Sequence, residues 1–261
     1  MKTKQAATET TRLLPGLTLR VARDYEAMSR AAAQHVAAAL RAKPDTLLCL
    51  ASGATPARTY ELLAEAGRRK PALFGRARLT KLDEWGGLAP DDPATCQVYL
   101  QERLCKPLGI GRDRWFGWHS QPRRPQVECE RIATWLATNG PIDVSLLGLG
   151  TNGHLGFNEP AAALQLGPHV ARLSRTSLTH SMLGTTRGRV RFGLTLGMGD
   201  LLRSREIVLL VNGGHKAAQF RRFFKQQLTS RFPVSFLWLH PALTIFCDRA
   251  AAALLPAEVL P

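Results

Sequence analysis

The sequence has few cysteines, few acidic residues and no long apolar run. No CxxC pair occurs, so we expect neither a zinc site nor a disulfide framework, and we predict reduced structural thiols at Cys49, Cys96, Cys105, Cys129 and Cys247. No apolar stretch approaches the ~20 residues of a membrane helix, and the first residues lack a hydrophobic signal core. We therefore expect a cytoplasmic protein that does not bind a membrane.

The shortage of acidic residues leaves a strong positive charge. Against 35 Lys and Arg there are 20 Asp and Glu, a formal charge of +15. Nucleic-acid binders use Lys and Arg to contact phosphates, so this excess makes nucleic-acid binding one function to consider. However, the basic residues lie in short groups without interleaved stacking aromatics, at 68–70, 123–124, 187–191 and 221–222. We expect a solvated, arginine-rich surface that attracts a small anionic substrate, and no nucleic-acid partner.

Two nucleotide-binding patterns are also missing. The chain has no lysine-bearing Walker loop and no three-glycine dinucleotide fingerprint, so neither a nucleoside triphosphate nor NAD is indicated. Instead, short apolar runs alternate with longer helical patterns. This alternation predicts an α/β fold of βαβ units, with a mainly parallel sheet and helices on both faces. No repeat or low-complexity linker divides the pattern, so we expect a flexible tail over 1–15 and a single domain over 16–261.

The alternation sets the expected elements. Strands are predicted at 17–21, 46–51, 78–82, 143–147, 169–173, 192–196, 207–211 and 243–246. Helices are predicted at 24–42, 55–68, 95–105, 126–138 and 216–227. The first of these helices opens at an acidic N-cap, Asp24, and the second has Pro56 in its first turn.

The segment LLGLGTNGHLGFNEP, residues 146–160, is the most informative part of the chain. An apolar strand ends in glycines and is followed by Asn152, His154 and Glu159, at the carboxyl end where parallel sheets place their ligand sites. Imidazole titrates near neutrality and needs a partner that fixes its tautomer, so these three residue types suit general acid/base chemistry. The alternative is that His154 caps a loop and Glu159 begins a helix.

A second strand, in TKLDEW at 80–85, also ends in carboxylates. Asp83 and Glu84 point to opposite sides if the strand continues, so at most one of them faces a ligand. A carboxylate in that position can remove a proton next to a carbonyl or imine if burial raises its pKa from the unperturbed ~3.9. A helix N-cap followed by a second acidic residue explains the same segment.

Two strand-to-helix turns can hold a phosphate. One offers backbone N–H groups and hydroxyls at the positive end of a helix, from Ser52, Gly53, Ala54 and Thr55. The other, NGGHK at 212–216, supplies Lys216 as a cation. Ordinary capping and an exposed helical lysine explain each turn by itself. Together, however, four polar strand ends imply one shared site.

These motifs carry a resemblance to a known family. With SGATPARTY, KLDEWGGL, GLGTNGHLGFNEP, NGGHK and SFLWLHP in order, residues 47–248 resemble the glucosamine-6-phosphate deaminase and 6-phosphogluconolactonase superfamily. LASGATP, KLDEW and NGHLGFNEP read together are most similar to the galactosamine-6-phosphate deaminase/isomerase branch. The resemblance implies a Rossmann-like α/β fold and an enzyme that converts galactosamine 6-phosphate to tagatose 6-phosphate and ammonia. Such an enzyme would be classed as an isomerase, deaminase and hydrolase. It implies no metal and no redox cofactor, and a homo-oligomer is compatible with it.

The resemblance also implies a role for each candidate residue. Asp83 would be the base that moves a proton between C2 and C1 of the sugar. His154 would assist ring opening, with Glu159 and Asn152 orienting or tuning it. The turn of small residues at 52–55 and the lysine of NGGHK would bind the phosphate.

Two positions differ from the glucosamine deaminases that the chain resembles. Those enzymes carry an aspartate where this chain has Asn152, whose amide cannot share a proton with imidazole or supply negative charge to it. Their phosphate-binding arginine has no clear counterpart, because Arg175 and Arg187 both flank the aligned stretch at 179–183. Three alternative functions stay open: glucosamine-6-phosphate deaminase, 6-phosphogluconolactonase, which the NEP at 158–160 disfavours, and a sugar-phosphate sensor without catalytic activity.

Overall fold

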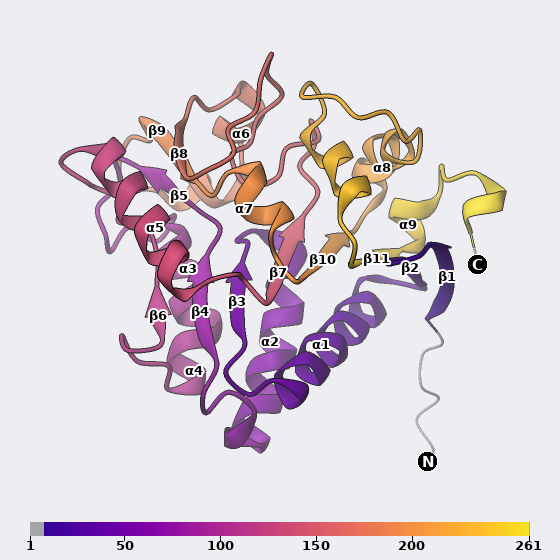
Figure 1. The fold of residues 1–261 in the computed structure, drawn as a ribbon, viewed down its shortest axis with the longest axis horizontal. Coiled ribbons are helices and arrows are strands. Elements are labelled where there is room, and N and C mark those ends of the chain that lie inside the picture. Colours follow the sequence, from indigo (N-terminus) through magenta and orange to yellow (C-terminus); the bar gives the residue numbers. More distant parts are fainter. Residues whose placement is uncertain (1–7, 261) are drawn as a thin grey trace.

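The computed structural model describes residues 8–260, and an eight-stranded sheet forms the centre of this part (Figure 1). The strands lie in the order β1-β2-β11-β10-β7-β3-β4-β6, and every neighbouring pair is parallel except β1 with β2. Their bounds are β1 Glu9–Leu14, β2 Leu17–Ala22, β3 Leu47–Leu50, β4 Arg78–Lys81, β6 Trp115–Phe116, β7 Val144–Gly148, β10 Glu206–Val211 and β11 Leu243–Asp248. The carboxyl ends of the parallel strands therefore share one edge of the sheet, where ligand sites form.

A second, three-stranded antiparallel sheet lies beyond the end of β4, at the upper left of Figure 1. Its strands are β5 Asp83–Gly86, β9 Phe192–Thr195 and β8 His169–Ala171, with β9 in the middle. Only Leu82 separates β4 from β5, so the chain passes directly from one sheet into the other. Trp85 and Phe157 pack in a small core here, with ring centroids 4.5 Å apart.

Helices cover both faces of the main sheet. The described helices are α1 Tyr25–Ala42, α2 Ala54–Arg69, α3 Cys96–Leu100, α4 Lys106–Leu108, α5 Pro125–Asn139, α6 Arg175–Leu178, α7 Met198–Leu202, α8 Ala217–Phe223 and α9 Arg249–Ala252. Residues of α1 and α2 share one apolar core with Leu48 and Leu50 of β3. Residues of α5, α7 and α8 share another core with Leu47 and Cys49 of the same strand. Alternate residues of a central strand thus supply both cores, as expected for a sheet buried on both sides.

The predicted fold class is confirmed, with two corrections. The predicted strands at 169–173 and 192–196 exist, but they belong to the small antiparallel sheet rather than to the parallel one. The flexible tail predicted over 1–15 is wrong for Glu9–Leu14, which forms β1 and pairs with β2. Residues 1–7 of that tail lie outside the described residues. Among residues 8–260, none of the helices is both long and apolar enough to span a membrane.

Candidate active site

A pocket opens where β3, β5 and the loops after β7 and β10 meet. Seven of the nine predicted site residues line it: Ser52, Gly53, Ala54, Thr55, Asp83, His154 and Lys216. The other two, Asn152 and Glu159, do not line it, but Glu159 contacts the lining residues His154 and Ser177 and Asn152 binds Glu159. The structure therefore brings the four polar strand ends to one place.

Asp83 begins β5, and its carboxyl is buried at the floor of the pocket with 8% exposure. Burial raises the pKa of Asp83 to about 7, and the neighbouring charge of Glu84 adds to this shift. One side-chain hydrogen bond acts in the opposite direction and lowers the pKa of Asp83. It comes from the Cys96 thiol, whose Sγ lies 3.6 Å from Asp83 Oδ1. Ser52 Oγ in turn donates to that sulfur at 2.9 Å. Asp83 therefore changes charge near neutral pH at the pocket surface.

Glu84 points to the other side of β5 and does not line the pocket. Its carboxylate forms an ion pair with the ammonium of Lys81, and both side chains are fully buried. It also accepts backbone N–H bonds from Trp85, Cys96 and Gln97, at 2.8, 2.8 and 2.9 Å. The last two belong to the N-terminal turn of α3, so Glu84 joins β4, β5 and α3 as a structural residue.

His154 lies in the loop after β7 with its ring against Gly150. A Cβ at position 150 would lie 2.3 Å from the imidazole Cδ2, so only glycine leaves room for the ring in this orientation. On the inner side of the ring, Nδ1 is 3.4 Å from Glu159 Oε2. The carboxylate is thus close enough to stabilise a positive charge on the imidazole, whose other edge faces the pocket.

Glu159 is held by a set of donors. Asn152 Nδ2 donates to Oε2 at 2.9 Å, Ser174 donates through N and Oγ to Oε1 at 3.2 and 3.0 Å, and the Ser177 hydroxyl donates to Oε1. Burial alone would raise the pKa of Glu159, but His154 and these donors outweigh it and lower the pKa to about 2. Glu159 therefore stays ionised throughout the neutral range.

Asn152 does not touch the imidazole ring. Its Oδ1 accepts the backbone N–H of His154 at 3.1 Å, and its Nδ2 binds Glu159 as described above. The negative charge that the amide cannot supply comes instead from the carboxylate of Glu159. The amide orients both of its neighbours without adding a charge.

The turn at 52–55 and Lys216 form an anion-binding face of the pocket. Gly53, with φ of 121°, is the N-cap of α2, and no side chain caps the first N–H groups of this 16-residue helix. Thr55 Oγ1 donates to Asn212 Oδ1 at 2.7 Å and so ties the turn to the loop that carries Lys216. Burial lowers the pKa of Lys216 to about 8, and no carboxylate of residues 8–260 pairs with it. Helix N–H groups beside an unpaired cation suit a phosphate.

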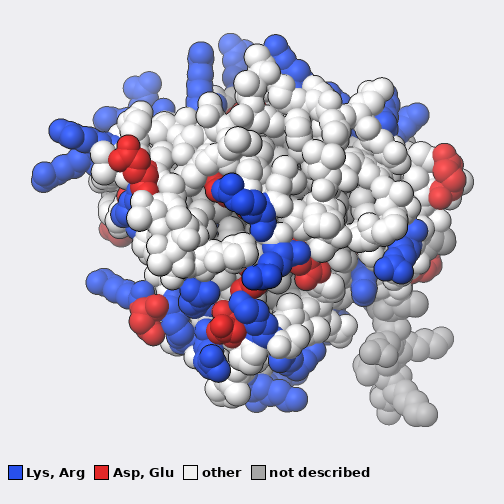
Figure 2. Space-filling model, viewed as in Figure 1, with Lys and Arg blue, Asp and Glu red and all other residues white. Residues whose placement is uncertain are grey.

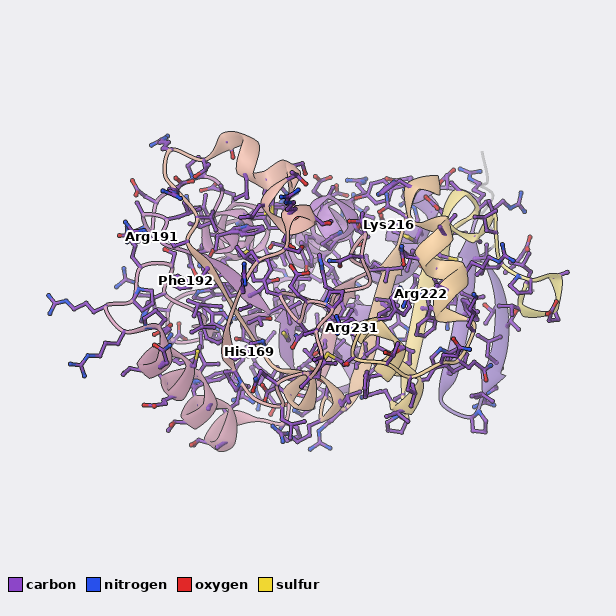
Figure 3. The ribbon with its side chains drawn as sticks, turned by 90° about the horizontal axis from the view of Figure 1, so that it is seen from above. His169, Arg191, Phe192, Lys216, Arg222 and Arg231 are labelled. Carbon is purple, nitrogen blue, oxygen red and sulfur yellow. The ribbon has the colours of Figure 1, made fainter. Side chains whose placement is uncertain are left out.

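Neither candidate arginine lines the pocket. Arg175 is exposed at the start of α6, and Arg187 donates its backbone N–H to Asp92. Arg191, which ends the basic group that Arg187 begins, lies toward the left end of the molecule seen from above and far from Lys216 (Figure 3). The position near the anion-binding face is taken by His180, which lines the pocket from the loop after α6. Sequence reasoning missed His180, since a histidine in a polar loop carries no local signal.

One face of the molecule shows how its surface charge is arranged. On the face shown in Figure 2, Lys and Arg side chains lie among acidic ones around a broad area without charge. On this face the two signs of charge are mixed, whereas a nucleic-acid binder typically carries a continuous basic stripe. The absence of a nucleic-acid partner stays a prediction from the sequence. Within residues 8–260, no three His, Cys, Asp or Glu side chains are grouped so that they could hold a metal ion.

Comparison with known proteins identifies the family. The family model described as glucosamine-6-phosphate isomerases/6-phosphogluconolactonase matches residues 23–245. The chain belongs to this family. It is 39% identical to the protein named "Putative deaminase AgaI" of Escherichia coli (strain K12), over 87% of this chain and 90% of that protein. It is 33% identical to the glucosamine-6-phosphate deaminase of Thermoanaerobacter pseudethanolicus, over 91% and 94% of the two chains.

Solved structures agree with this family membership. A monomeric glucosamine-6-phosphate deaminase superimposes with a TM-score of 0.84 at 31% identity, covering 90% of this chain and 99% of the other. The 6-phosphogluconolactonase of Trypanosoma brucei, at 19% identity and a TM-score of 0.75, shares the fold. The predicted family is confirmed, but the predicted hydrolase class is wrong, because the two relatives above and the solved structure at 31% identity are all named as deaminases.

Proposed function

We propose that this chain is an amino-sugar phosphate deaminase/isomerase that converts galactosamine 6-phosphate to tagatose 6-phosphate and ammonia. One observation carries the proposal: the Asp83 carboxyl, with a pKa of about 7, opens on the same pocket as His154 and Lys216. A carbon base must be ionised yet basic at neutral pH, and an ordinary aspartate with a pKa near ~3.9 is a weaker base by about three units.

The chemistry divides among the residues by their surroundings. His154, with Glu159 behind it, can carry the proton that moves between the ring oxygen and O1 when the sugar ring opens. Asp83 can then take the proton from C2 while the aldehyde oxygen O1 gains a proton, which gives an enolamine with a C1–C2 double bond. Return of the proton to C1, with loss of a proton from the nitrogen, leaves an imine at C2. Water adds to that imine, and the nitrogen leaves as ammonia. None of these reaction steps transfers electrons to a cofactor.

The phosphate is proposed to lie between the N-terminus of α2 and Lys216. This end of the pocket offers helix N–H groups without a side-chain cap and a half-buried cation. Anchoring the phosphate here would fix C1 and C2 relative to Asp83, and such positioning supplies a large part of the rate of many enzymes.

Two sugar phosphates are candidate substrates. The motif pattern favours galactosamine 6-phosphate, and the chain is more similar to the Escherichia coli deaminase, at 39%, than to the Thermoanaerobacter glucosamine-6-phosphate deaminase, at 33%. Glucosamine 6-phosphate is the second candidate because several relatives are named for it. A cytoplasmic location stays a prediction from the sequence.

The test is an assay of the purified protein with both epimers side by side. Ammonia and ketose phosphate are measured for galactosamine 6-phosphate and glucosamine 6-phosphate at equal concentrations, and we expect a higher kcat/KM for the first. Preference for the second would reverse the choice of substrate. Absence of ammonia from both, at micromolar enzyme, would reject the deaminase function.

A further inference from the structure

His180 lies beside the anion-binding face and plays no part in the proton chemistry proposed above. It is the N-cap of a 3-10 helix, η3 (Ser181–Thr185), and it lines the pocket together with Gly53 and Lys216. Its ring packs near Trp85, with centroids 6.0 Å apart, and is half-buried. The ring is therefore held in place from the side of the small sheet.

The hydrogen bonding of the ring fixes its tautomer. The backbone N–H of Met182 donates to Nδ1 at 3.3 Å, so Nδ1 must be the unprotonated nitrogen and Nε2 carries the hydrogen. Burial, followed by the charges of His154 and Lys216, lowers the pKa of His180, which keeps the ring neutral at pH 7. His180 is thus a neutral donor with a defined direction.

Nε2 points toward the turn that begins α2. A Cβ at Gly53 would lie 3.5 Å from Nε2, so this nitrogen sits beside the N-cap of the helix. No hydrogen bond joins it to another group of residues 8–260. An N–H donor without a partner among residues 8–260, beside uncapped helix N–H groups and a half-buried lysine, is placed to bind the same anion as they do.

We infer that His180 is a phosphate-binding residue of this site, donating its Nε2–H to a phosphoryl oxygen held between the N-terminus of α2 and Lys216. The inference rests on the proposed function for the identity of the substrate, but the ligand group itself is a phosphate monoester or free phosphate. Because the donor is neutral, it adds no positive charge to that of Lys216, the only lysine or arginine among the described residues that line the pocket.

Two substitutions separate phosphate binding by His180 from its structural role as the N-cap of η3. In His180→Asn, the amide oxygen can still accept the Met182 N–H as an N-cap, but the shorter side chain has no distal donor. In His180→Gln, an N–H donor remains at nearly the reach of Nε2. His215→Ala is the matched control, because His215 is exposed, adjacent to Lys216, and outside the pocket lining.

Inorganic phosphate is the probe, measured by calorimetry at pH 7.5 and constant ionic strength, beside steady-state kinetics. We expect His180→Asn to raise the Kd for phosphate and the KM for the sugar phosphate about ten-fold, as for a lost hydrogen bond to a charged group, with kcat within about three-fold. We expect His180→Gln to recover most of the affinity and His215→Ala to match the wild type.

The outcomes distinguish this inference from the proposed function. Unchanged phosphate affinity in His180→Asn, with normal turnover, would overturn the inference and leave the function standing. A fall in kcat at constant KM would also overturn it, because the ring would then act on the reacting atoms. If the wild type released no ammonia but its phosphate affinity depended on His180, the inference would hold and the proposed function would fail.

Discussion

Asp83 and Glu84 are neighbours in β5, yet the two faces of this strand give their carboxylates opposite properties. Glu84 faces inward to Lys81 and three backbone N–H groups, so its carboxylate accepts four hydrogen bonds. Asp83 faces the pocket with a single thiol donor, and its pKa rises to about 7. Both side chains are buried, so burial alone does not decide the outcome. The number of donors distinguishes them: Glu84 has four, whereas Asp83 has one thiol, and a buried carboxylate with so few donors becomes a base near neutrality.

Asp83→Asn should show the largest effect. It removes the carbon base, so kcat should fall about 10³-fold or more, while affinity for inorganic phosphate should remain. Stability should move the other way: the pKa of Asp83 rises from 3.8 to about 7 on folding, so the wild type loses stability as the pH rises between these two values. The variant should therefore melt at a higher temperature than the wild type at pH 8, with the difference shrinking as the pH falls from about 7 to about 4. Retention of a tenth of kcat would refute the base assignment.

Glu84→Gln should damage folding instead of chemistry. The substitution leaves the Lys81 ammonium fully buried without its carboxylate, which destabilises a protein by about 3–5 kcal/mol. Urea unfolding should show this loss, while kcat per folded molecule stays close to that of the wild type. A stable but inactive Glu84→Gln protein would break the contrast between the two faces of β5.

Glu159→Gln extends the comparison to a third carboxylate, which is saturated like Glu84 but lies beside a pocket histidine. Loss of its charge should lower kcat about 100-fold, because imidazole loses the anion that stabilises its protonated form. Glu128→Gln is the control, since Glu128 is also buried and held by Arg131, outside the pocket. Equal activity losses in the two variants would show that Glu159 acts only through stability.

The pH profile of kcat/KM should be bell-shaped. Activity should rise as Asp83 ionises near pH 7 and fall as Lys216 loses its proton near pH 8, since burial raises the pKa of the first and lowers that of the second. Lys216→Arg, whose guanidinium stays charged, should move the alkaline limb upward and leave the acid limb in place. An alkaline limb unaffected by this substitution would exclude Lys216 as its source.

Cys96→Ala should have the smallest effect and the most specific one. The thiol lowers the pKa of Asp83, so its removal should move the acid limb of the profile upward by less than about one pH unit. Cys105→Ala, a buried cysteine away from the pocket, should leave the profile unchanged. An acid limb that moves downward, or equally in both variants, would contradict the role of the thiol.

The parallel sheet could be predicted from the sequence because its strands carry their signal locally. Runs such as 207–211 are apolar throughout and are followed by helical periodicity, and they form β10 and the helix beyond it. The second sheet could not be predicted in the same way. β5 has only four residues, and its pairing with β9, more than 100 residues later, depends on tertiary contacts. β1 was missed because its residues are mostly polar and exposed.

The site was predictable to the same extent. Asp83, His154 and Lys216 each follow an apolar strand, so their common location follows from the geometry of a parallel sheet. The sequence could not show whether Asp83 or Glu84 faces the pocket. The alternation of side chains along a strand places the two on opposite faces but does not say which face lines the pocket. His180 reaches the pocket from a loop outside the main sheet, and no periodicity places such a residue.

The passage of the chain from β4 into β5 has a mechanical consequence. Asp83 belongs to the small sheet, whereas the turn at 52–55 and the His154 loop extend from the main sheet, so the distance between base and substrate is set by how the two sheets dock. Trp85 and Phe157 lie at that joint. The backbone of Leu82 links the two sheets, since its N–H donates to Leu50 O at the end of β3 and its oxygen accepts from Leu196 N just after β9, both at 3.0 Å. A slight displacement of one sheet at this junction would carry the carboxylate away from the sugar carbons, and the turnover rate would then depend on how the two sheets are aligned.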